Sequence, residues 1–210
     1  MDTATITRDV GTHTLVATAA TQFAPIVEDV LGVLEGQTEH LRDGYVLQFG
    51  WGPIFLRAEE GALRLSTPDY RGNAADDRTD DLTAAIATQV SQRWLPDAAN
   101  VAPAEVRFDQ EALILRGWED LEDFEASREV SRIEIYSGWF ICSTEERDEP
   151  YPREDILKVP LWQVVQRQPQ LAQVLAMPPD TLTILLDGAV DRVVALTDEP
   201  HWLYLNPDTA

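Results

Sequence analysis

The chain of 210 residues contains a single cysteine, Cys142, and a single lysine, Lys158. One cysteine excludes an intrachain disulfide and is typical of a reducing compartment. No apolar run approaches the roughly 18 residues that a membrane-spanning helix needs. The first twenty residues carry Thr and Asp where a secretory signal has basic residues followed by an unbroken apolar core. We therefore expect a cytoplasmic protein without a membrane segment.

Basic residues are also scarce. Sixteen Lys and Arg stand against 37 Asp and Glu, and the formal net charge is −21 at pH 7. Such a charge repels phosphate backbones and anionic lipid surfaces, which argues against nucleic acid or a membrane as the partner. A basic protein would be attracted, mainly through faster association. The alternative is that the acidity serves only solubility. Abundant Ala, Asp and Arg beside one lysine suggest a high-GC bacterium.

Short elements of mixed type predict an α+β protein with a mostly antiparallel sheet and three to four short helices. Apolar, β-prone runs predict strands at 3–6, 13–17, 45–49, 54–57, 63–66, 106–108, 112–115, 133–136, 139–142, 181–186, 190–195 and 202–205, the first two at sheet edges. Glu59-Glu60-Gly61 and Asp187-Gly188 are typical of hairpin turns. The hairpin spacing of these runs favours antiparallel pairing.

Helices are indicated by proline, glycine and apolar periodicity. Pro25 can occupy the first turn of a helix that Gly36 ends, and its predicted inward face comprises Ile26, Val30, Val33 and Leu34. The clearest helix spans 80–95 between Thr79 and Pro96, and its predicted apolar face comprises Leu82, Ile86, Val90 and Trp94. Two shorter helices begin at Pro160 and Pro169. The 96–103 connection is the one natural seam, so the chain forms either two α+β subdomains, 1–100 and 101–210, or one continuous unit, which we slightly favour.

Patterns for catalysis or metal binding are sparse. Cys142 ends the apolar run 139–142, which predicts a buried strand with a structural thiol and with Trp139 in the core. His13, His40 and His201 lack metal-ligand spacing, and no P-loop or nucleophile elbow is present. We predict no catalytic residue, cofactor or metal. The alternative is a small hydrolase or transferase that uses a pair of carboxylates.

Three acidic clusters stand out. The first, at 76–81, is typical of a solvated helix start. The second surrounds Trp118, Leu121 and Phe124, and the third includes Tyr151; carboxylates interleaved with aromatics can form apolar anchors inside a charged rim. Alternatively, the aromatics of the second cluster point inward. The predicted partner-binding residues are Trp118, Glu119, Asp120, Glu122, Asp123, Glu145, Glu146, Asp148, Glu149 and Tyr151.

A longer motif runs through the second half of the chain. It comprises Arg128, Ser137-Gly138-Trp139-Phe140, Glu145-Glu146, Tyr151, Val159-Pro160-Leu161, Pro169-Gln170-Leu171, Leu175 and Pro178. This order resembles the SGW-containing immunity proteins of bacterial polymorphic-toxin systems, over roughly residues 104–195. The family usually has a glycine shortly after the SGW strand, where this chain has Ser143-Thr144, and the first hundred residues have no counterpart.

The resemblance implies an immunity protein that binds and neutralises a cognate toxin in interbacterial competition. It names neither the toxin nor the oligomeric state. An acidic immunity protein suits a basic target such as a nuclease. The remaining alternative is an acidic adaptor or scaffold without a toxin partner.

Overall fold

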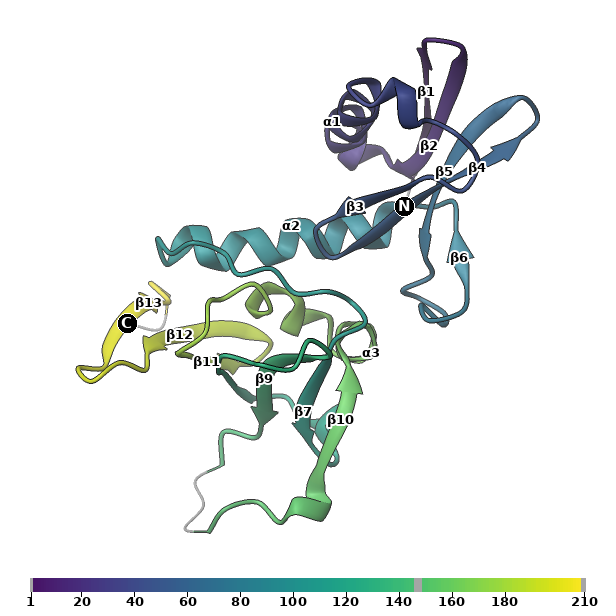
Figure 1. The fold of residues 1–210 in the computed structure, drawn as a ribbon. Helices are drawn as coiled ribbons and strands as arrows, with labels where there is room; N and C mark the ends of the chain where they lie inside the picture. The colour runs from purple at the N-terminus through teal and green to yellow at the C-terminus, as the bar shows by residue number, and fades with distance from the viewer. Residues whose placement is uncertain (1, 146–148, 209–210) are drawn as a thin grey trace. The chain divides into compact units, whose positions relative to one another are not determined.

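The computed structural model describes residues 2–145 and 149–208 (Figure 1). The chain forms two compact units, Met1–Gln89 and Val90–Ala210. Each unit contains its own mostly antiparallel sheet together with short helices, so the α+β prediction is confirmed. The boundary between the units falls within one helix, whereas the sequence placed the seam in the 96–103 connection that follows this helix.

The first unit contains a sheet with the strand order β1-β2-β5-β4-β3, and a short strand, β6, pairs with β5. The strands are β1 (Thr3–Val10), β2 (His13–Ala20), β3 (Val46–Phe49), β4 (Gly52–Glu59), β5 (Ala62–Pro68) and β6 (Arg78–Thr79). Strands β2 and β5 run parallel, and the other neighbours run antiparallel. The strands predicted in this part of the chain are confirmed, but β2 lies between β1 and β5 rather than at an edge.

Helix α1 (Ala24–Glu35) lies between the 3-10 turns η1 (Thr21–Phe23) and η2 (Thr38–His40), and Gly36 ends it as predicted. Its inward face differs from the prediction: Val33 is 50% exposed, whereas Val27 and Leu31 belong to the core. The buried residues of α1 are Val27, Val30, Leu31 and Leu34. They follow the i, i+3, i+4, i+7 spacing of one helix face. Ile26 is partly buried and packs against this core as predicted, whereas Val33 does not.

Helix α2 (Thr83–Ala98) begins later and ends later than predicted. A side-chain oxygen of Asp81 accepts a hydrogen bond from the Thr83 backbone N–H at 3.0 Å, which satisfies a free donor at the helix start. Pro96 lies inside the helix instead of ending it. Val90 and Trp94, predicted to face inward, are 43% and 46% exposed.

The second unit contains a seven-stranded sheet with the order β10-β7-β9-β8-β11-β12-β13, in which only the β7–β9 pair is parallel. The strands are β7 (Glu111–Leu115), β8 (Phe124–Arg128), β9 (Tyr136–Cys142), β10 (Ile156–Pro160), β11 (Thr181–Leu186), β12 (Ala189–Ala195) and β13 (His201–Leu205). The helical elements are η3 (Trp118–Asp120), η4 (Arg153–Asp155), α3 (Leu161–Arg167) and η5 (Pro169–Val174). Both helical segments predicted to begin at Pro160 and Pro169 are present.

Burial alternates along the central strands of this sheet. Ile114 of β7, Ala126 of β8 and Ile141 of β9 are completely buried, and the residues beside them are partly or fully exposed, except Cys142 at the end of β9. The buried side chains face the segment that contains η5, since the Trp139 indole N–H donates to the Leu175 carbonyl at 3.1 Å. The sheet therefore has one face covered by α3 and η5 and one open face.

Two strand predictions in this unit are wrong and two strands were missed. Residues 106–108 form no strand; the Phe108 carbonyl instead accepts a hydrogen bond from the N–H of Trp162 at the start of α3. Residues 133–135 form a turn that precedes β9. Strands β8 and β10 were not predicted, because charged residues such as Arg128 occupy positions that the alternating pattern assigns to apolar ones.

Among the helices of the described chain, none combines the length and the apolar character that crossing a bilayer requires.

Candidate binding surface

The Ser137-Gly138-Trp139 motif forms an irregular part of β9. Gly138 has a φ of +84°, and a Cβ there would lie 2.0 Å from the Glu129 carbonyl oxygen, so the position requires glycine. The Gly138 carbonyl accepts a hydrogen bond from the Glu129 N–H at 3.0 Å. The Ser137 hydroxyl donates to the Glu111 carbonyl at 2.9 Å, where the β7–β9 register shifts. The motif therefore joins β9 to both neighbouring strands.

Trp139 and Arg128 form a buried pair beneath this irregularity. Trp139 is 1% exposed, which confirms its predicted place in the core. The Arg128 guanidinium lies 5.6 Å from the centre of a Trp139 ring and donates to the backbone carbonyls of Ala104, Ser137 and Met177 at 2.8, 3.2 and 2.5 Å. Burial lowers the pKa of Arg128 to about 10. Two residues of the motif, Arg128 and Trp139, therefore connect the sheet to the segments that cover its buried face.

Cys142 lies at the end of β9 with 4% of its surface exposed, as predicted for a structural thiol. Burial, followed by the charge of Glu125, raises the pKa of this thiol to about 11. Both effects suppress the thiolate that a nucleophile requires. Within the described residues, no group of three or more His, Cys, Asp and Glu side chains is arranged to hold a metal ion.

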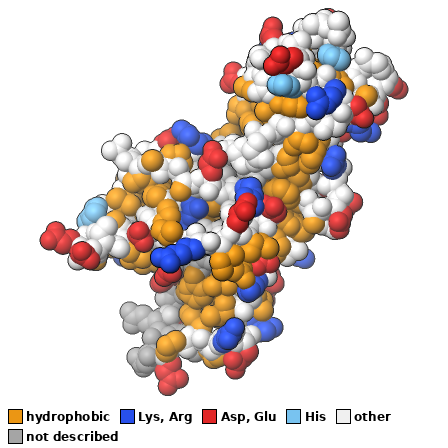
Figure 2. All heavy atoms as spheres, viewed as in Figure 1, with side chains coloured by type: hydrophobic (Ala, Val, Ile, Leu, Met, Phe, Trp, Pro, Cys, Tyr) orange, Lys and Arg blue, Asp and Glu red, His pale blue; other side chains and the backbone are white. Residues whose placement is uncertain are grey.

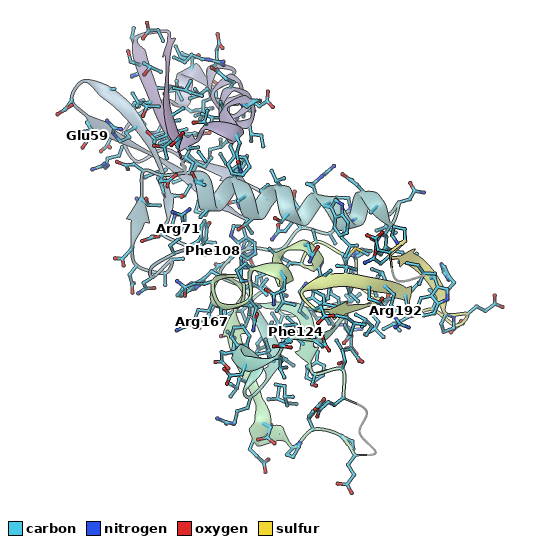
Figure 3. All side chains as sticks on the ribbon, turned by 180° about the vertical axis from the view of Figure 1, so that it is seen from behind. Glu59, Arg71, Phe108, Phe124, Arg167 and Arg192 are labelled. Carbon is cyan, nitrogen blue, oxygen red and sulfur yellow. The ribbon has the colours of Figure 1, made fainter. Side chains whose placement is uncertain are left out.

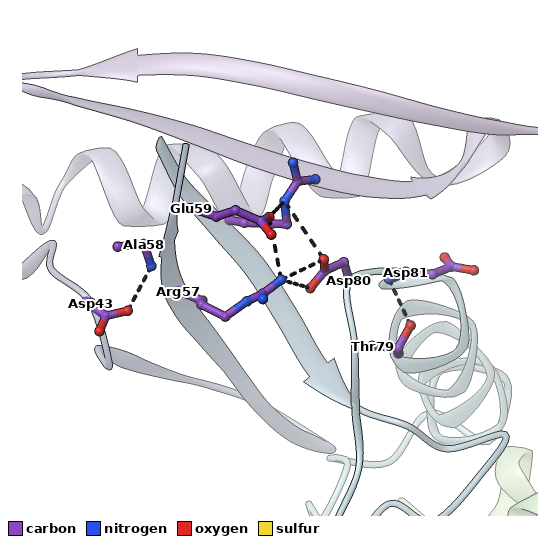
Figure 4. A network of polar contacts seen from close by, with 8 residues as sticks. Asp43, Arg57, Ala58, Glu59, Thr79, Asp80 and Asp81 are labelled. Atoms are coloured by element: carbon purple, nitrogen blue, oxygen red, sulfur yellow. Dashed lines mark hydrogen bonds and ion pairs between the residues drawn. The ribbon is translucent and has the colours of Figure 1, made fainter. Parts of the chain in front are cut away.

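Residues of the first acidic cluster form hydrogen bonds and ion pairs within the first unit. Asp80 accepts two hydrogen bonds from Arg57, at 3.0 and 3.3 Å, and lies 3.8 Å from Arg64 (Figure 4). Both arginines also pair with Glu59. Asp81 caps α2, as described above. This agrees with the interpretation of the 76–81 run as a helix start.

The second and third acidic clusters, by contrast, converge. Strand pairing joins Leu115 of β7 to Ile156 of β10, and Glu125 of β8 to Cys142 of β9. The same end of the sheet includes the end of β11, because Leu185 pairs with Phe124. The connections at these strand ends therefore lie at one edge of the sheet. They are the segment 116–123, the described parts of 143–155, and the turn 187–188.

Hydrogen bonds connect these segments. The Arg116 N–H donates to the Asp155 carbonyl at 2.7 Å, and its guanidinium donates to the Glu154 carbonyl at 2.8 Å. The Asp187 N–H donates to a carboxylate oxygen of Asp123 at 2.9 Å. We call the carboxylates of these segments the acidic edge: Glu119, Asp120, Glu122, Asp123, Glu145, Glu149, Glu154, Asp155 and Asp187.

The predicted contact residues divide into three groups. Glu119, Asp120, Glu122, Glu145 and Glu149 are exposed on the acidic edge, and Asp123 is half-buried. Glu146 and Asp148 lie outside the described residues. Trp118 is only 2% exposed, so the prediction that it contacts a partner is wrong for the folded chain.

The aromatic residues of the second cluster adopt the inward alternative. The Trp118 carbonyl accepts a hydrogen bond from buried Gln168 at 3.4 Å, which ties η3 to α3. Phe124 is completely buried and lies among the packed side chains of the second unit (Figure 3). Tyr151 of the third cluster is half-buried, with its ring centre 6.1 Å from that of Phe140. The acidic edge therefore presents carboxylates rather than apolar anchors.

The open face of the sheet contains a groove of about 740 Å³ that the sequence analysis missed. Its apolar lining comes from β7, β9, β10 and the 129–133 segment: Leu113, Val130, Ile133, Tyr136, Phe140 and Ile156. Its charged lining consists of Glu111, Glu129, Arg132, Arg153 and Lys158. Figure 2 shows hydrophobic side chains gathered over β7, β9 and β10, with Lys and Arg side chains among them. We call this feature the sheet groove.

Comparison of the chain with protein-family models, with curated proteins and with solved structures gives no match. The resemblance to toxin-immunity proteins therefore stays a prediction.

Proposed function

We propose that this chain is an immunity-type protein that neutralises a cognate toxin by binding it, and that the acidic edge contacts a basic surface of that toxin. One observation carries the proposal: two acidic clusters that are separate in the sequence converge at one edge of the seven-stranded sheet. Because the second and third acidic clusters lie at the same edge, their carboxylates form one negative surface. The resemblance lies within the same unit and adds the expectation of a toxin as the partner.

Two basic residues, Arg116 and Arg153, stand against the nine carboxylates in the described parts of these segments. Over the described part of the chain, the one ion pair of the acidic edge joins Arg116 to Asp155 at 3.8 Å. This pair offsets the charge of one of the nine carboxylates of the acidic edge. An uncompensated charged surface attracts an oppositely charged protein and raises its association rate. A basic toxin, such as a nuclease, has the charge that this surface favours.

The partner can be identified through the gene next to that of this chain, since toxin and immunity genes are adjacent. Co-expression of the neighbouring gene product should yield a stable complex, and this chain should restore growth to cells that express the toxin. A neighbouring product that neither co-purifies nor inhibits growth would argue for the adaptor alternative.

The acidic edge itself is tested by reversing four exposed carboxylates to lysine, at Glu119, Asp120, Glu122 and Glu149. A matched variant reverses exposed carboxylates elsewhere, at Asp29, Glu60, Asp77 and Asp198. The two variants have the same net charge. We expect the first to slow association with the toxin about 10-fold or more, and the second to have a much smaller effect.

High salt should remove most of the difference, because the Debye length falls to about 3 Å at 1 M. Association rates measured by stopped flow at low and high salt provide both comparisons. Equal rates for the two variants at low salt would contradict a specific role of the acidic edge, even if the complex forms.

A further inference from the structure

Cations are concentrated around the sheet groove in a chain that has few of them. The only lysine, Lys158, lines the groove together with Arg132 and Arg153. All three side chains are exposed, and no ion pair joins any of them to a carboxylate of the residues that the structure describes. Most other arginines of the chain do form such pairs. The groove thus carries three cations without an ion pair to the described carboxylates, of which Lys158 also feels the charge of Glu111.

The groove beneath these cations is apolar and of a size suited to a small ligand. Leu113, Phe140 and Ile156 contribute its lining from three adjacent strands. Its volume of about 740 Å³ falls in the range of about 300–1,000 Å³ that small-molecule sites occupy. A single side chain of a protein partner would fill only part of it.

Lys158 is held in place within this lining. Its ammonium group donates a hydrogen bond to the Tyr136 hydroxyl and lies 4.7 Å from the centre of the Tyr136 ring. The two acids of the lining, Glu111 and Glu129, are outnumbered by the three cations. The lining therefore has one more cation than anions, although the chain as a whole is strongly negative.

We propose that the sheet groove binds a small amphipathic anion, with its apolar body on the sheet face and its anionic head at Lys158. A carboxylate or sulfonate would accept a hydrogen bond from the ammonium and gain from the nearby guanidinium groups. This site lies on the sheet face, adjoins the acidic edge at Arg153, and goes beyond toxin neutralisation. It holds whether or not the chain has a toxin partner.

The test uses 1-anilinonaphthalene-8-sulfonate, a fluorescent probe with an aromatic body and a sulfonate head, on the full chain. We expect saturable binding of one probe per chain. Decanoate should displace the probe at least about tenfold more effectively than decanol, because a hydrogen bond to a charged group is worth about that factor or more. Failure of the probe to saturate, or equal displacement by decanol, would overturn the proposal.

Two pairs of variants locate the site. Lys158→Ala should weaken probe binding about tenfold, whereas Arg167→Ala removes an exposed cation of the same unit that does not line the groove and should leave binding unchanged. Leu113→Glu places a charge on the groove lining and should abolish binding. Leu196→Glu changes a similarly exposed leucine of the second unit outside the groove and should not.

Thermal melts separate loss of binding from loss of fold, because all four substituted side chains are exposed and each variant should melt close to the wild type. Probe binding that persists in both Lys158→Ala and Leu113→Glu would show that the probe binds elsewhere and would refute the assignment. A groove that serves instead as an apolar contact surface for a toxin segment would bind decanoate no better than decanol in the free chain, and this result also counts against the proposal.

Discussion

Gly138→Ala tests the role of the SGW motif more sharply than any other substitution in the chain. Gly138 has a φ of +84°, and an added Cβ would lie 2.0 Å from the Glu129 carbonyl oxygen and 3.2 Å from its carbonyl carbon. Gly117 has nearly the same φ, +81°, but no atom lies within 4 Å of the position of its Cβ. The two glycines share the backbone strain and differ in the contact, so Gly117→Ala is a matched control.

The magnitudes follow from these contacts. A left-handed conformation costs an L-residue about 1–2 kcal/mol, which applies to both variants. At Gly138 the contact is with backbone, which can yield only if β8 and β9 move apart. This movement weakens the Glu129–Gly138 hydrogen bond, worth about 0.5–1.5 kcal/mol, and disturbs the buried Arg128 next to it. We expect Gly138→Ala to lower the free energy of unfolding by about 3–5 kcal/mol and Gly117→Ala by about 1–2 kcal/mol.

Urea unfolding of the full chain, followed by tryptophan fluorescence, measures the difference. Five of the six tryptophans lie beyond Gln89, so the signal reports mainly on the second unit. Far-UV circular dichroism shows whether the two units unfold in one transition, and the comparison uses the transition that fluorescence detects. If both variants lose the same stability within about 0.5 kcal/mol, close packing at Gly138 does not explain the motif.

Three further substitutions or reactions probe the covered face of the second unit. Trp139→Ala should cost about 3–5 kcal/mol, and a variant that melts like the wild type would show that Trp139 is not a core residue. Arg128→Met should lower the free energy of unfolding by about 2–4 kcal/mol, because it leaves the carbonyls of Ala104, Ser137 and Met177 without their donor. Arg128→Lys should not restore this loss. Full stability of either variant in urea would contradict the expectation. With its pKa raised to about 11 from 9.0, Cys142 should carry about 100-fold less thiolate at pH 8 than an ordinary thiol, so iodoacetamide should modify it slowly in the native chain and rapidly in denaturant. Rapid native labelling would disprove its burial.

The raised pKa of Cys142 also has a consequence for stability. Because the folded chain holds this proton more tightly than the unfolded chain, the contribution is fully present below about pH 9 and is lost as the pH rises through about 11. Arg128 has the opposite effect on stability. Its pKa falls to about 10 on folding, so the burial of its charge destabilises the folded chain less as the pH rises above about 10.

Local chemistry was sufficient for the turns and most of the strands. Glu60-Gly61 and Asp187-Gly188 both adopt positive φ at two successive residues, as a two-residue hairpin turn requires, and the strands on either side pair as predicted. Helix α1 ends at Gly36, and α3 begins after Pro160, for similarly local reasons. The burial of Trp139 and Cys142 also followed from one short apolar run.

The features that the sequence did not indicate, or indicated wrongly, depend on the tertiary surroundings of each residue. Arg128 is buried because carbonyls at 104, 137 and 177 surround it, and no pattern near residue 128 indicates them. Trp118 was expected to be an exposed anchor, yet η3 places it in the core against α3. Val90 and Trp94 continue the spacing of a buried helix face but are exposed.

The sequence by itself determined the excess of acidic charge, the α+β class and the acidic segments at 118–125 and 145–155, because each depends on composition or on neighbours within about ten residues. Only the tertiary structure decided that these segments share one edge, since this follows from the pairing of β8 with β9 and of β7 with β10. The sheet groove has the same origin. Leu113, Phe140 and Lys158 stand on three strands that are separate in the sequence, and a binding surface forms only when the strand order places them side by side.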